Sequence, residues 1–347
     1  MIETILEKYQ KENNSLTDLS IYELLSAKGD DREAIFAAAR NARAKYFGNE
    51  IFLYGFVYFS TYCQNHCNFC YYRNSNSMPP RYRKSTDEII ETAVELKESG
   101  VHLIDLTMGE DLFYLEHPEK LIEIVKLVKE ETDLPVMVSA GVVSDDCIER
   151  LAEVGADWYA LYQETHNKSL FSKLRSGQDY DGRMHCKLFA RKNGMLIEEG
   201  ILTGVGEAIS DRIHSFREMG RVNAKQIRTM TFIPQDGIPM QKNSNPEFSD
   251  ELLNIAVMRL IYPDKLIPAS LDVDGLNGLE SRLMAGANVI TSIIPPKKGY
   301  AGVAHAVQDI DEGYRTVSGV QEIIQKCGLI SADAASYKEK IGRWKNI

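Results

Sequence analysis

Three closely spaced cysteines are the clearest candidates for chemistry in this sequence. They occur in Cys63-Gln-Asn-His-Cys67-Asn-Phe-Cys70, so the intervals between them are four and three residues. A loop with this spacing can wrap one face of a cubic iron–sulfur cluster, since such clusters take thiolate ligands. Three thiolates hold three irons, and the fourth iron stays open to a small molecule that chelates through its amine and carboxylate.

Other interpretations of the same cysteines fit less well. His66 lies inside the loop and offers a fourth ligand for zinc, which normally has four closed ligands in a structural site. However, His66 is adjacent to Cys67 and is poorly placed to point inward together with all three thiolates. Buried structural cysteines would have apolar flanks and no pattern. We therefore expect a [4Fe–4S] cluster, with a non-catalytic metal-binding module as the remote alternative.

A single arginine in an otherwise apolar run is the next candidate. Arg228 lies in residues 226–233, which read as a strand. If its side chain points into the interior of a closed sheet, it is a buried cation that needs an anion. A guanidinium prefers to hold a carboxylate through two hydrogen bonds, which suggests a clamp on an amino-acid carboxylate. The alternative is an arginine on the outer face, paired with a carboxylate on a helix.

Acidic residues in two segments are candidates for binding an ammonium group. Ser270, Asp272 and Asp274 alternate in Pro-Ala-Ser-Leu-Asp-Val-Asp-Gly, so an extended backbone places them on one face. The alternative is a turn or a helix N-cap before residue 277. We expect Asp272 to face a substrate and Asp274 to act as a cap or a supporting residue. Asp111 is a further candidate for the ammonium, with simple solvation in a loop as its alternative.

Short apolar runs alternate with helical stretches along most of the chain. Eight runs rich in β-branched and aromatic residues read as strands: 51–60, 101–107, 134–139, 157–162, 195–203, 226–233, 266–271 and 287–292. Regular alternation gives a parallel sheet, and eight units fit a closed (β/α)8 TIM barrel of the α/β class. An open doubly wound sheet is the weaker alternative, because no Gly-x-Gly-x-x-Gly follows any of these strands.

Helical patterns flank the predicted barrel on both sides. Residues 16–27 and 32–46 carry apolar residues at helical spacing, as do 313–325 and 332–341. We expect a helical extension over residues 1–50, the barrel over 51–300 and C-terminal helices packing on it over 301–347. In such a barrel the catalytic groups lie at the C-terminal ends of the strands. Polar residues stand at those ends repeatedly: the cysteines, Glu110 with Asp111, Ser139, Glu164, Ser270 and Asp272, while Arg228 lies within the sixth strand.

The overall charge and the N-terminus exclude several other classes of protein. The net charge of −10 argues against broad binding to nucleic acid or to an anionic membrane. The N-terminus has no basic start followed by an apolar core, so it does not read as a signal peptide. No apolar run approaches the roughly 20 residues that span a bilayer. We expect a cytoplasmic protein without nucleic-acid or membrane partners.

With these elements assigned, the motif Cys-x-x-x-Cys-x-aromatic-Cys after a first strand resembles the signature of the radical S-adenosylmethionine (SAM) family. Leu-Thr-Met-Gly-Glu-Asp at 106–111 matches that family's segment after the second strand. Tyr-Gln-Glu-Thr at 162–165 and the following Leu-Arg-Ser-Gly resemble the biotin-synthase-related branch, especially its hydrogenase-maturation type. The resemblance implies a set of SAM contacts: Phe69 near the adenine, the backbone of Tyr71 or Tyr72, Glu110, Ser139, Glu164, and Arg183 on the carboxylate.

Within that branch, the chain from about Leu16 to its end is most similar to the lysine mutases of pyrrolysine biosynthesis. This resemblance implies an isomerase that converts L-lysine into (3R)-3-methyl-D-ornithine through a 5′-deoxyadenosyl radical. It also implies a [4Fe–4S] cluster, SAM and a one-electron reductant of the ferredoxin or flavodoxin type. The alternative is an enzyme of the hydrogenase-maturation type that acts on another small amino acid.

Several remaining residues receive structural or weaker interpretations. Cys147, Cys186 and Cys327 form no second thiolate group, so we expect them to pack structurally, which argues against sulfur insertion. Tyr300, in a Gly-rich stretch after the last predicted strand, is a weaker candidate for covering SAM.

Overall fold

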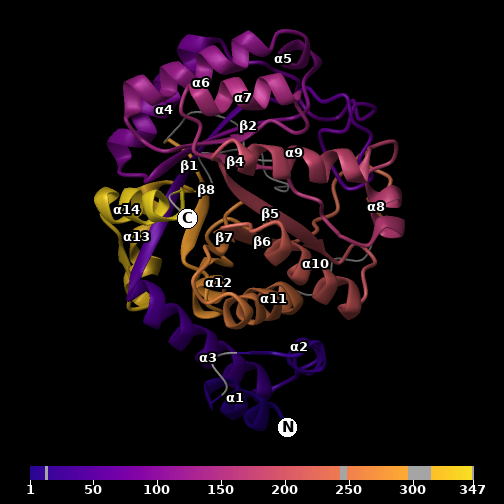
Figure 1. Cartoon of the computed structure of the whole chain (residues 1–347), viewed down its shortest axis with the longest axis vertical. Helices are drawn as coiled ribbons and strands as arrows, with labels where there is room; N and C mark the ends of the chain where they lie inside the picture. Colours follow the sequence, from indigo (N-terminus) through magenta and orange to yellow (C-terminus); the bar gives the residue numbers. More distant parts are fainter. Residues whose placement is uncertain (12–14, 243–247, 296–313, 346–347) are drawn as a thin grey trace.

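A computed structural model describes residues 1–11, 15–242, 248–295 and 314–345 of the chain. Within these ranges, eight parallel strands follow the order β6-β5-β4-β3-β2-β1-β8-β7. Their bounds are β1 (Glu50–Ser60), β2 (Leu103–Met108), β3 (Val136–Ser139), β4 (Trp158–Ala160), β5 (Leu196–Thr203), β6 (Gln226–Thr231), β7 (Pro268–Ser270) and β8 (Val289–Ile293). A parallel bridge between Gln226 and Leu266 joins β6 to β7. The predicted (β/α)8 barrel is therefore confirmed (Figure 1).

Helices surround the strands and cover the outside of the barrel (Figure 1). The main ones are α4 (Thr86–Ser99), α6 (Pro118–Thr132), α7 (Asp145–Glu153), α9 (Tyr180–Lys192), α10 (Ile209–Arg221), α11 (Phe248–Ile261) and α12 (Leu279–Met284), with short α5 (Leu112–Glu116) and α8 (Lys168–Leu174) in the loops. The first of them begins with a capping box, since Glu88 N–H donates to Ser85 Oγ and Ser85 N–H donates to Glu88. Within the described residues, no helix is both long and apolar enough to cross a bilayer.

The strands have two differently filled faces because side chains alternate along them. In β1, the residues Ile51, Leu53, Val57 and Phe59 pack in the large core between sheet and helices. Phe52, Tyr54, Phe56 and Tyr58 belong to a second core, inside the barrel. The same alternation puts Asp105, Glu198 and Arg228 on inward-facing positions of β2, β5 and β6, where all three are buried.

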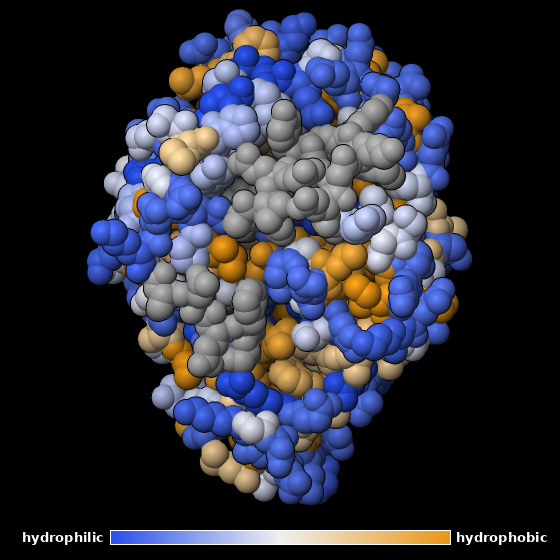
Figure 2. All heavy atoms as spheres, turned by 180° about the vertical axis from the view of Figure 1, so that it is seen from behind, coloured by the Kyte–Doolittle hydropathy of each residue, from blue (hydrophilic) through white to orange (hydrophobic). Residues whose placement is uncertain are grey.

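The terminal helices pack against the barrel. The N-terminal α1 (Ile2–Lys11), α2 (Asp18–Leu25) and α3 (Asp30–Phe47) lie together, and α3 packs on α11. At the other end, β9 (Ile330–Ser331) pairs with β1, between α13 (Val317–Lys326) and α14 (Ala334–Lys345). The Tyr337 hydroxyl of α14 lies 2.7 Å from that of Tyr54, and Trp344 packs edge-on against Trp158. Helix α14 thus covers the N-terminal ends of the strands. On the face opposite to that of Figure 1, apolar side chains gather near the middle, beside a hollow (Figure 2).

Candidate active site

The three cysteines lie in the loop after β1 and line one cavity of about 980 Å³, open to solvent, at the C-terminal ends of the strands. The loop is fixed by backbone hydrogen bonds: Gln64 N–H donates to Glu110 O at 2.9 Å, and Asn68 N–H to Leu174 O at 2.8 Å. Gly109 is needed beside it, since a Cβ there would lie 2.3 Å from the carbonyl oxygen of Tyr62 and 2.7 Å from Cys63 Cβ. The close approach of two loops thus brings the thiols to the cavity.

The surroundings of the thiols suit an iron–sulfur cluster. The Cys67 Sγ accepts a hydrogen bond from Gln178 Nε2 at 2.9 Å and one from Arg175 Nη1 at 3.6 Å. Among the described residues, no group of three or more His, Cys, Asp or Glu closes around a single ion. Thiols that share a cavity, with donors aimed at sulfur, fit a cluster in which each sulfur binds a different iron.

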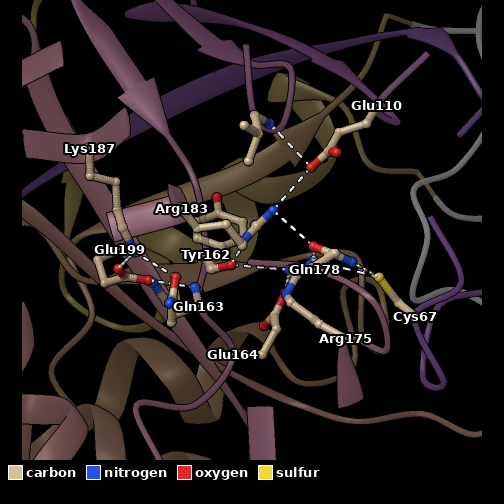
Figure 3. Close-up of polar contacts among 12 residues, drawn as sticks. Cys67, Glu110, Tyr162, Gln163, Glu164, Arg175, Gln178, Arg183, Lys187 and Glu199 are labelled. Carbon is tan, nitrogen blue, oxygen red and sulfur yellow. Dashed lines mark hydrogen bonds and ion pairs between the residues drawn. The ribbon is translucent and has the colours of Figure 1, made fainter. Parts of the chain in front are cut away.

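A network of buried charged side chains lies beside the cysteines (Figure 3). Arg183 Nη1 donates to Glu110 Oε1 at 3.0 Å, and its Nη2 donates to the carbonyl of Tyr162 at 2.8 Å. Arg175 Nη2 donates to Glu164 Oε1 at 2.7 Å, and its guanidinium lies over the ring of Phe69, 5.3 Å from the centroid. All four charged groups line the cavity of the cysteines. They offer two cations and two anions to a zwitterionic ligand.

The loop after β4 is held by a second ionic group on the outer face of β5. Glu199 Oε1 accepts hydrogen bonds from the backbone N–H of Gln163 at 2.7 Å and of Gly200 at 2.9 Å. Its other oxygen pairs with Lys187 of α9, and both side chains are fully buried. Burial alone would raise the pKa of Glu199, but Lys187 and His166 lower it to about 2. This ion pair fixes the segment in which Glu164 adopts a left-handed backbone conformation with a φ of 65°.

A second cavity adjoins the first and reaches deeper into the barrel. Seven residues line both cavities: Tyr58, Phe69, Cys70, Thr107, Ser139, Tyr162 and Glu164. The deeper one also contains Phe56, Leu202, Arg228, Met230, Thr231, Phe232, Ile233 and Asp272. Ser139 Oγ is buried and lies beside the carboxyl of Asp105. The two cavities therefore share a wall, and a molecule in one could contact a molecule in the other.

Arg228 points into the barrel, and its alternative placement on the outer face is excluded. Its Nε donates to Glu198 Oε1 at 2.7 Å, and its guanidinium lies over the ring of Tyr162, 5.4 Å from the centroid. The negative charge of Glu198 holds the pKa of Arg228 above its usual value despite burial, so the side chain stays cationic. Nη2 is buried and lacks a partner in the described part of the chain. This edge of the guanidinium is available to a carboxylate.

Asp272 lines the deeper cavity but is already paired. Its carboxylate accepts hydrogen bonds from Tyr58 at 2.8 Å, Ser292 at 2.6 Å and Arg315 at 2.8 Å. These partners hold the pKa of Asp272 below its usual value, although burial acts in the opposite direction. Ser270 Oγ accepts a hydrogen bond from the backbone N–H of Asp272 at 3.3 Å, which helps to fix the backbone of this residue. An ammonium arriving here would join an existing ion pair rather than meet a lone carboxylate.

Two other aspartates considered in the sequence are engaged by neighbouring side chains. Asp111 caps α5 through the N–H of Phe113, and its carboxylate also accepts two hydrogen bonds from Arg83, both at 2.8 Å, and one from Ser60. Neither cavity described above includes Asp111 in its lining. Asp274 makes an ion pair with Arg282 at 2.6 Å instead of capping a helix.

Sequence reasoning missed Asp105, the inward-facing acid of β2. Its Oδ1 accepts a hydrogen bond from Thr107 Oγ1 at 2.9 Å, and the Ser139 hydroxyl lies beside the same carboxyl. Burial, with the negative charge of Glu198, raises the pKa of Asp105 to about 7. The same signal that identified Arg228, a charged residue inside an apolar strand, would have found it.

The remaining predicted residues have mixed placements. The ring of Tyr72, not that of Tyr71, lines the cavity. The six cysteines are all free; Cys147 and Cys186 are buried and Cys327 is partly buried. Cys186 Sγ donates a weak hydrogen bond to the carbonyl of Val143. Tyr300 lies outside the described residues.

A parallel barrel with three cysteines after its first strand, facing paired acids and arginines, defines a class of enzyme. The profile of the Radical SAM superfamily matches residues 57–219, and the chain belongs to this superfamily. It is 43% identical over 339 residues to the 3-methylornithine synthase of Methanosarcina barkeri strain Fusaro, covering 97% of this chain and 95% of that protein. Within the superfamily, the chain therefore belongs to the family of the 3-methylornithine synthases.

Further similarities support this assignment. The crystal structure of methylornithine synthase (PylB) superimposes with a TM-score of 0.91 and 42% identity, covering 98% of this chain and 99% of that one. The [FeFe] hydrogenase maturase subunit HydE of Thermotoga maritima is 32% identical over 292 residues, covering 82% of each chain. The predicted membership in the biotin-synthase-related branch agrees with these relatives and with several biotin synthases at 25–27% identity.

Proposed function

We propose that this protein is a radical SAM mutase that converts L-lysine into (3R)-3-methyl-D-ornithine in pyrrolysine biosynthesis. The 43% identity over nearly the whole chain to a protein of that name supports the reaction. The observation that carries the proposal is the shared wall of the two cavities. Cys70, Ser139 and Glu164 line both, so a cofactor on the cysteines and a substrate near Arg228 would lie in direct contact.

In this proposal, Cys63, Cys67 and Cys70 would hold a [4Fe–4S] cluster, and SAM would bind beside it. When bound, the cluster and SAM would supply the radical chemistry that removes a hydrogen atom from the substrate. The protein binds and orients the two ligands. Its charged groups and Ser139 are suited to the polar parts of SAM, while the ring of Phe69 packs beside the adenine.

The proposed assignments within the SAM site follow from charge. Arg183 lies near Glu110, and Arg175 lies near Glu164, so each cation is already balanced by an acid. A SAM carboxylate would bind the arginines, and its ammonium would bind the acids, so that the zwitterionic amino-acid part of SAM adds no net charge to the two ion pairs. The backbone near Tyr71 and Tyr72 would border the adenine.

The substrate assignments rest on the charges inside the barrel. Asp105, Glu198 and Asp272 supply three acids there against the guanidiniums of Arg228 and Arg315. The excess of one acid complements lysine, which has two ammonium groups and one carboxylate. We assign the carboxylate to Arg228 and one ammonium to Asp272, which Ser270 supports. The other ammonium is assigned to Asp105, which does not itself line the cavities but lies directly behind Thr107, a residue of both linings that donates a hydrogen bond to it. The sequence-based assignment of Asp111 is withdrawn from this proposal, because Arg83, Ser60 and the α5 cap engage its carboxylate.

The donor of the electron and the compartment are part of the same proposal. A low-potential one-electron carrier of the ferredoxin or flavodoxin type would reduce the cluster. The cytoplasm keeps thiols reduced, which agrees with six free cysteines in one chain.

The test is anaerobic reconstitution followed by a lysine assay. We expect about four irons and four sulfides per chain, and conversion of L-lysine into an isomer of equal mass, detected by chromatography and mass spectrometry with SAM and a reductant. Cys67→Ala removes a ligand, so the cluster absorbance and the product are both lost. Cys327→Ala is the matched control, because this thiol lies on the far side of the fold at the end of α13. Full lysine conversion by Cys67→Ala, or no conversion by the reconstituted wild type, would refute the proposal.

A further inference from the structure

Gln178 connects a cluster thiol to the two arginines of the SAM site (Figure 3). Its Nε2 lies 2.9 Å from Cys67 Sγ. Its Oε1 accepts hydrogen bonds from Arg183 Nη1 at 3.1 Å and, more weakly, from Arg175 Nη1 at 3.4 Å. Sequence reasoning did not single out this glutamine, and the mechanism proposed above does not use it.

The orientation of the Gln178 amide follows from its neighbours. Guanidinium groups have only donors, so the side of the amide that faces Arg175 and Arg183 must be the carbonyl oxygen. The amide N–H2 is therefore directed at the sulfur of Cys67. An opposite orientation would place N–H groups against two cations and an oxygen against a thiolate.

The backbone holds Gln178 in this position. Gly177 has a φ of 80°, a left-handed conformation that reverses the chain between α8 and α9. The Gln178 N–H donates to the Arg175 carbonyl at 3.0 Å, and the next residue, Asp179, caps α9 through the N–H of Asp181. The turn is thus fixed on both sides, and the partly exposed glutamine reaches inward.

We propose that Gln178 is a positioning residue that raises the reduction potential of the cluster through an N–H···S hydrogen bond to Cys67. Reduction adds negative charge to the cluster and its thiolates, and a donor at sulfur stabilises that charge. The guanidiniums that hold the amide oxygen are those assigned to the SAM carboxylate, so the same side chain connects the cofactor site to the cluster. This inference rests on the proposed assignment of the cluster to the three cysteines.

The experiment measures the cluster and not lysine turnover. Gln178→Met keeps the length of the side chain but removes the donor, and Gln178→Glu keeps its shape but places a carboxylate beside the thiolate. Asn68→Ala is the matched control, since it removes an amide from the same loop that donates instead to the Lys173 carbonyl at 2.7 Å. Each reconstituted protein, without SAM or lysine, is equilibrated at one fixed potential near the wild-type midpoint, and the reduced fraction is measured by electron paramagnetic resonance.

We expect the ratio of reduced to oxidised cluster to fall about fivefold in Gln178→Met, the size expected for the loss of one hydrogen bond. At 59 mV per tenfold for one electron, this corresponds to about 40 mV. Gln178→Glu lowers the ratio further, and Asn68→Ala matches the wild type. In a separate titration with SAM, Gln178→Met also binds SAM more weakly than the wild type, because Arg175 and Arg183 lose a shared acceptor.

The outcomes separate this inference from the proposed function. Wild-type protein without iron and sulfide refutes both. A wild-type cluster with an unchanged reduced fraction in Gln178→Met and in Gln178→Glu refutes the inference alone. An equal fall in Asn68→Ala also refutes it, because the loop in general, and not the N–H···S contact, would then set the potential. If Gln178→Met fails to assemble a cluster, the isosteric Gln178→Glu decides.

Discussion

Replacing Asp105 by asparagine separates the proposed role of this acid in lysine binding from its effect on stability. The substitution keeps the shape of the side chain and removes its charge. In the folded protein, burial and the charge of Glu198 raise the pKa of Asp105 to about 7. If the ionised form holds a lysine ammonium, the carboxyl is about one-tenth ionised at pH 6 and about nine-tenths ionised at pH 8. We therefore expect the affinity of the wild type for lysine to rise about tenfold between these pH values.

The asparagine variant should lack this dependence. A hydrogen bond to a charged group contributes about 1.5–3 kcal/mol, so at pH 8 the variant should bind lysine about 10- to 100-fold more weakly. The assay is equilibrium binding of labelled lysine to the unreduced, SAM-loaded protein at pH 6, 7 and 8. An Asp105→Asn variant that binds lysine as tightly as the wild type at pH 8 would refute the assignment.

Stability should change in the opposite direction. The folded-state pKa of Asp105 is raised above the ordinary value of 3.8, so its contribution is fully present below pH ~4 and is lost as the pH rises toward 7. A rise from 3.8 to about 7 corresponds to on the order of 4 kcal/mol. Without lysine at pH 8, the asparagine variant should therefore have the higher free energy of unfolding, and the difference should shrink at pH 5. Denaturant unfolding at both pH values measures this, and a less stable variant at pH 8 would contradict the reasoning.

Three further substitutions test the remaining assignments. Arg228→Ala should weaken lysine binding at least tenfold while SAM still binds. It should also lower the free energy of unfolding by about 3–5 kcal/mol, because Glu198 is left buried without its ion-pair partner. A lysine affinity equal to that of the wild type would contradict the assignment of Arg228 to the substrate site. Asp111→Asn should leave lysine affinity within twofold of the wild type in the same binding assay, and a larger loss would restore the role predicted from the sequence. Lys187→Met should lower the free energy of unfolding, measured with denaturant, by about 3–5 kcal/mol, because Glu199 is left buried without its cation. A decrease of less than 1 kcal/mol would show that the ion pair does not stabilise the fold.

The barrel was predictable because its strands follow elementary patterns. Short β-branched and aromatic runs recur between helices, and this alternation leads to a parallel closed sheet. The predicted runs 157–162 and 266–271 are longer than the ladders of β4 and β7, which contain three residues each. Apolar residues continue past the last paired residue there. An apolar run therefore predicts which residues are buried, but not at which residue the hydrogen bonding between strands ends.

The helix α9 shows a helical pattern around Cys186 but only an incomplete apolar face, for a physical reason. Its buried face includes Arg183 and Lys187, whereas an amphipathic pattern assumes that buried positions are apolar. Both cations have buried acidic partners on other elements, Glu110 and Glu199. The bounds of a helix that packs through ion pairs are therefore harder to predict from the sequence than those of a helix with a continuous apolar face.

The acids of the site show where sequence reasoning ends. Asp111 is a candidate from its sequence position because it stands in a loop at a strand end, whereas Asp105 lies inside a strand and the sequence analysis did not consider it. In the structure, Asp111 caps helix α5, and Asp105 is buried on the inward-facing side of β2. Nothing in the local sequence shows that Arg83, 28 residues upstream, engages Asp111.

The adjacent glutamates of β5 explain how the two halves of the site keep their relative position. Since side chains alternate along a strand, Glu198 points inward to Arg228 while Glu199 points outward to Lys187 and the N–H of Gln163. The first contact orients the proposed clamp for the lysine carboxylate, and the second fixes the loop that carries the SAM-site acid. Radical transfer requires the two ligands to be held at a short and constant separation. One rigid strand with two successive acids meets that requirement without a movable connection between the sites.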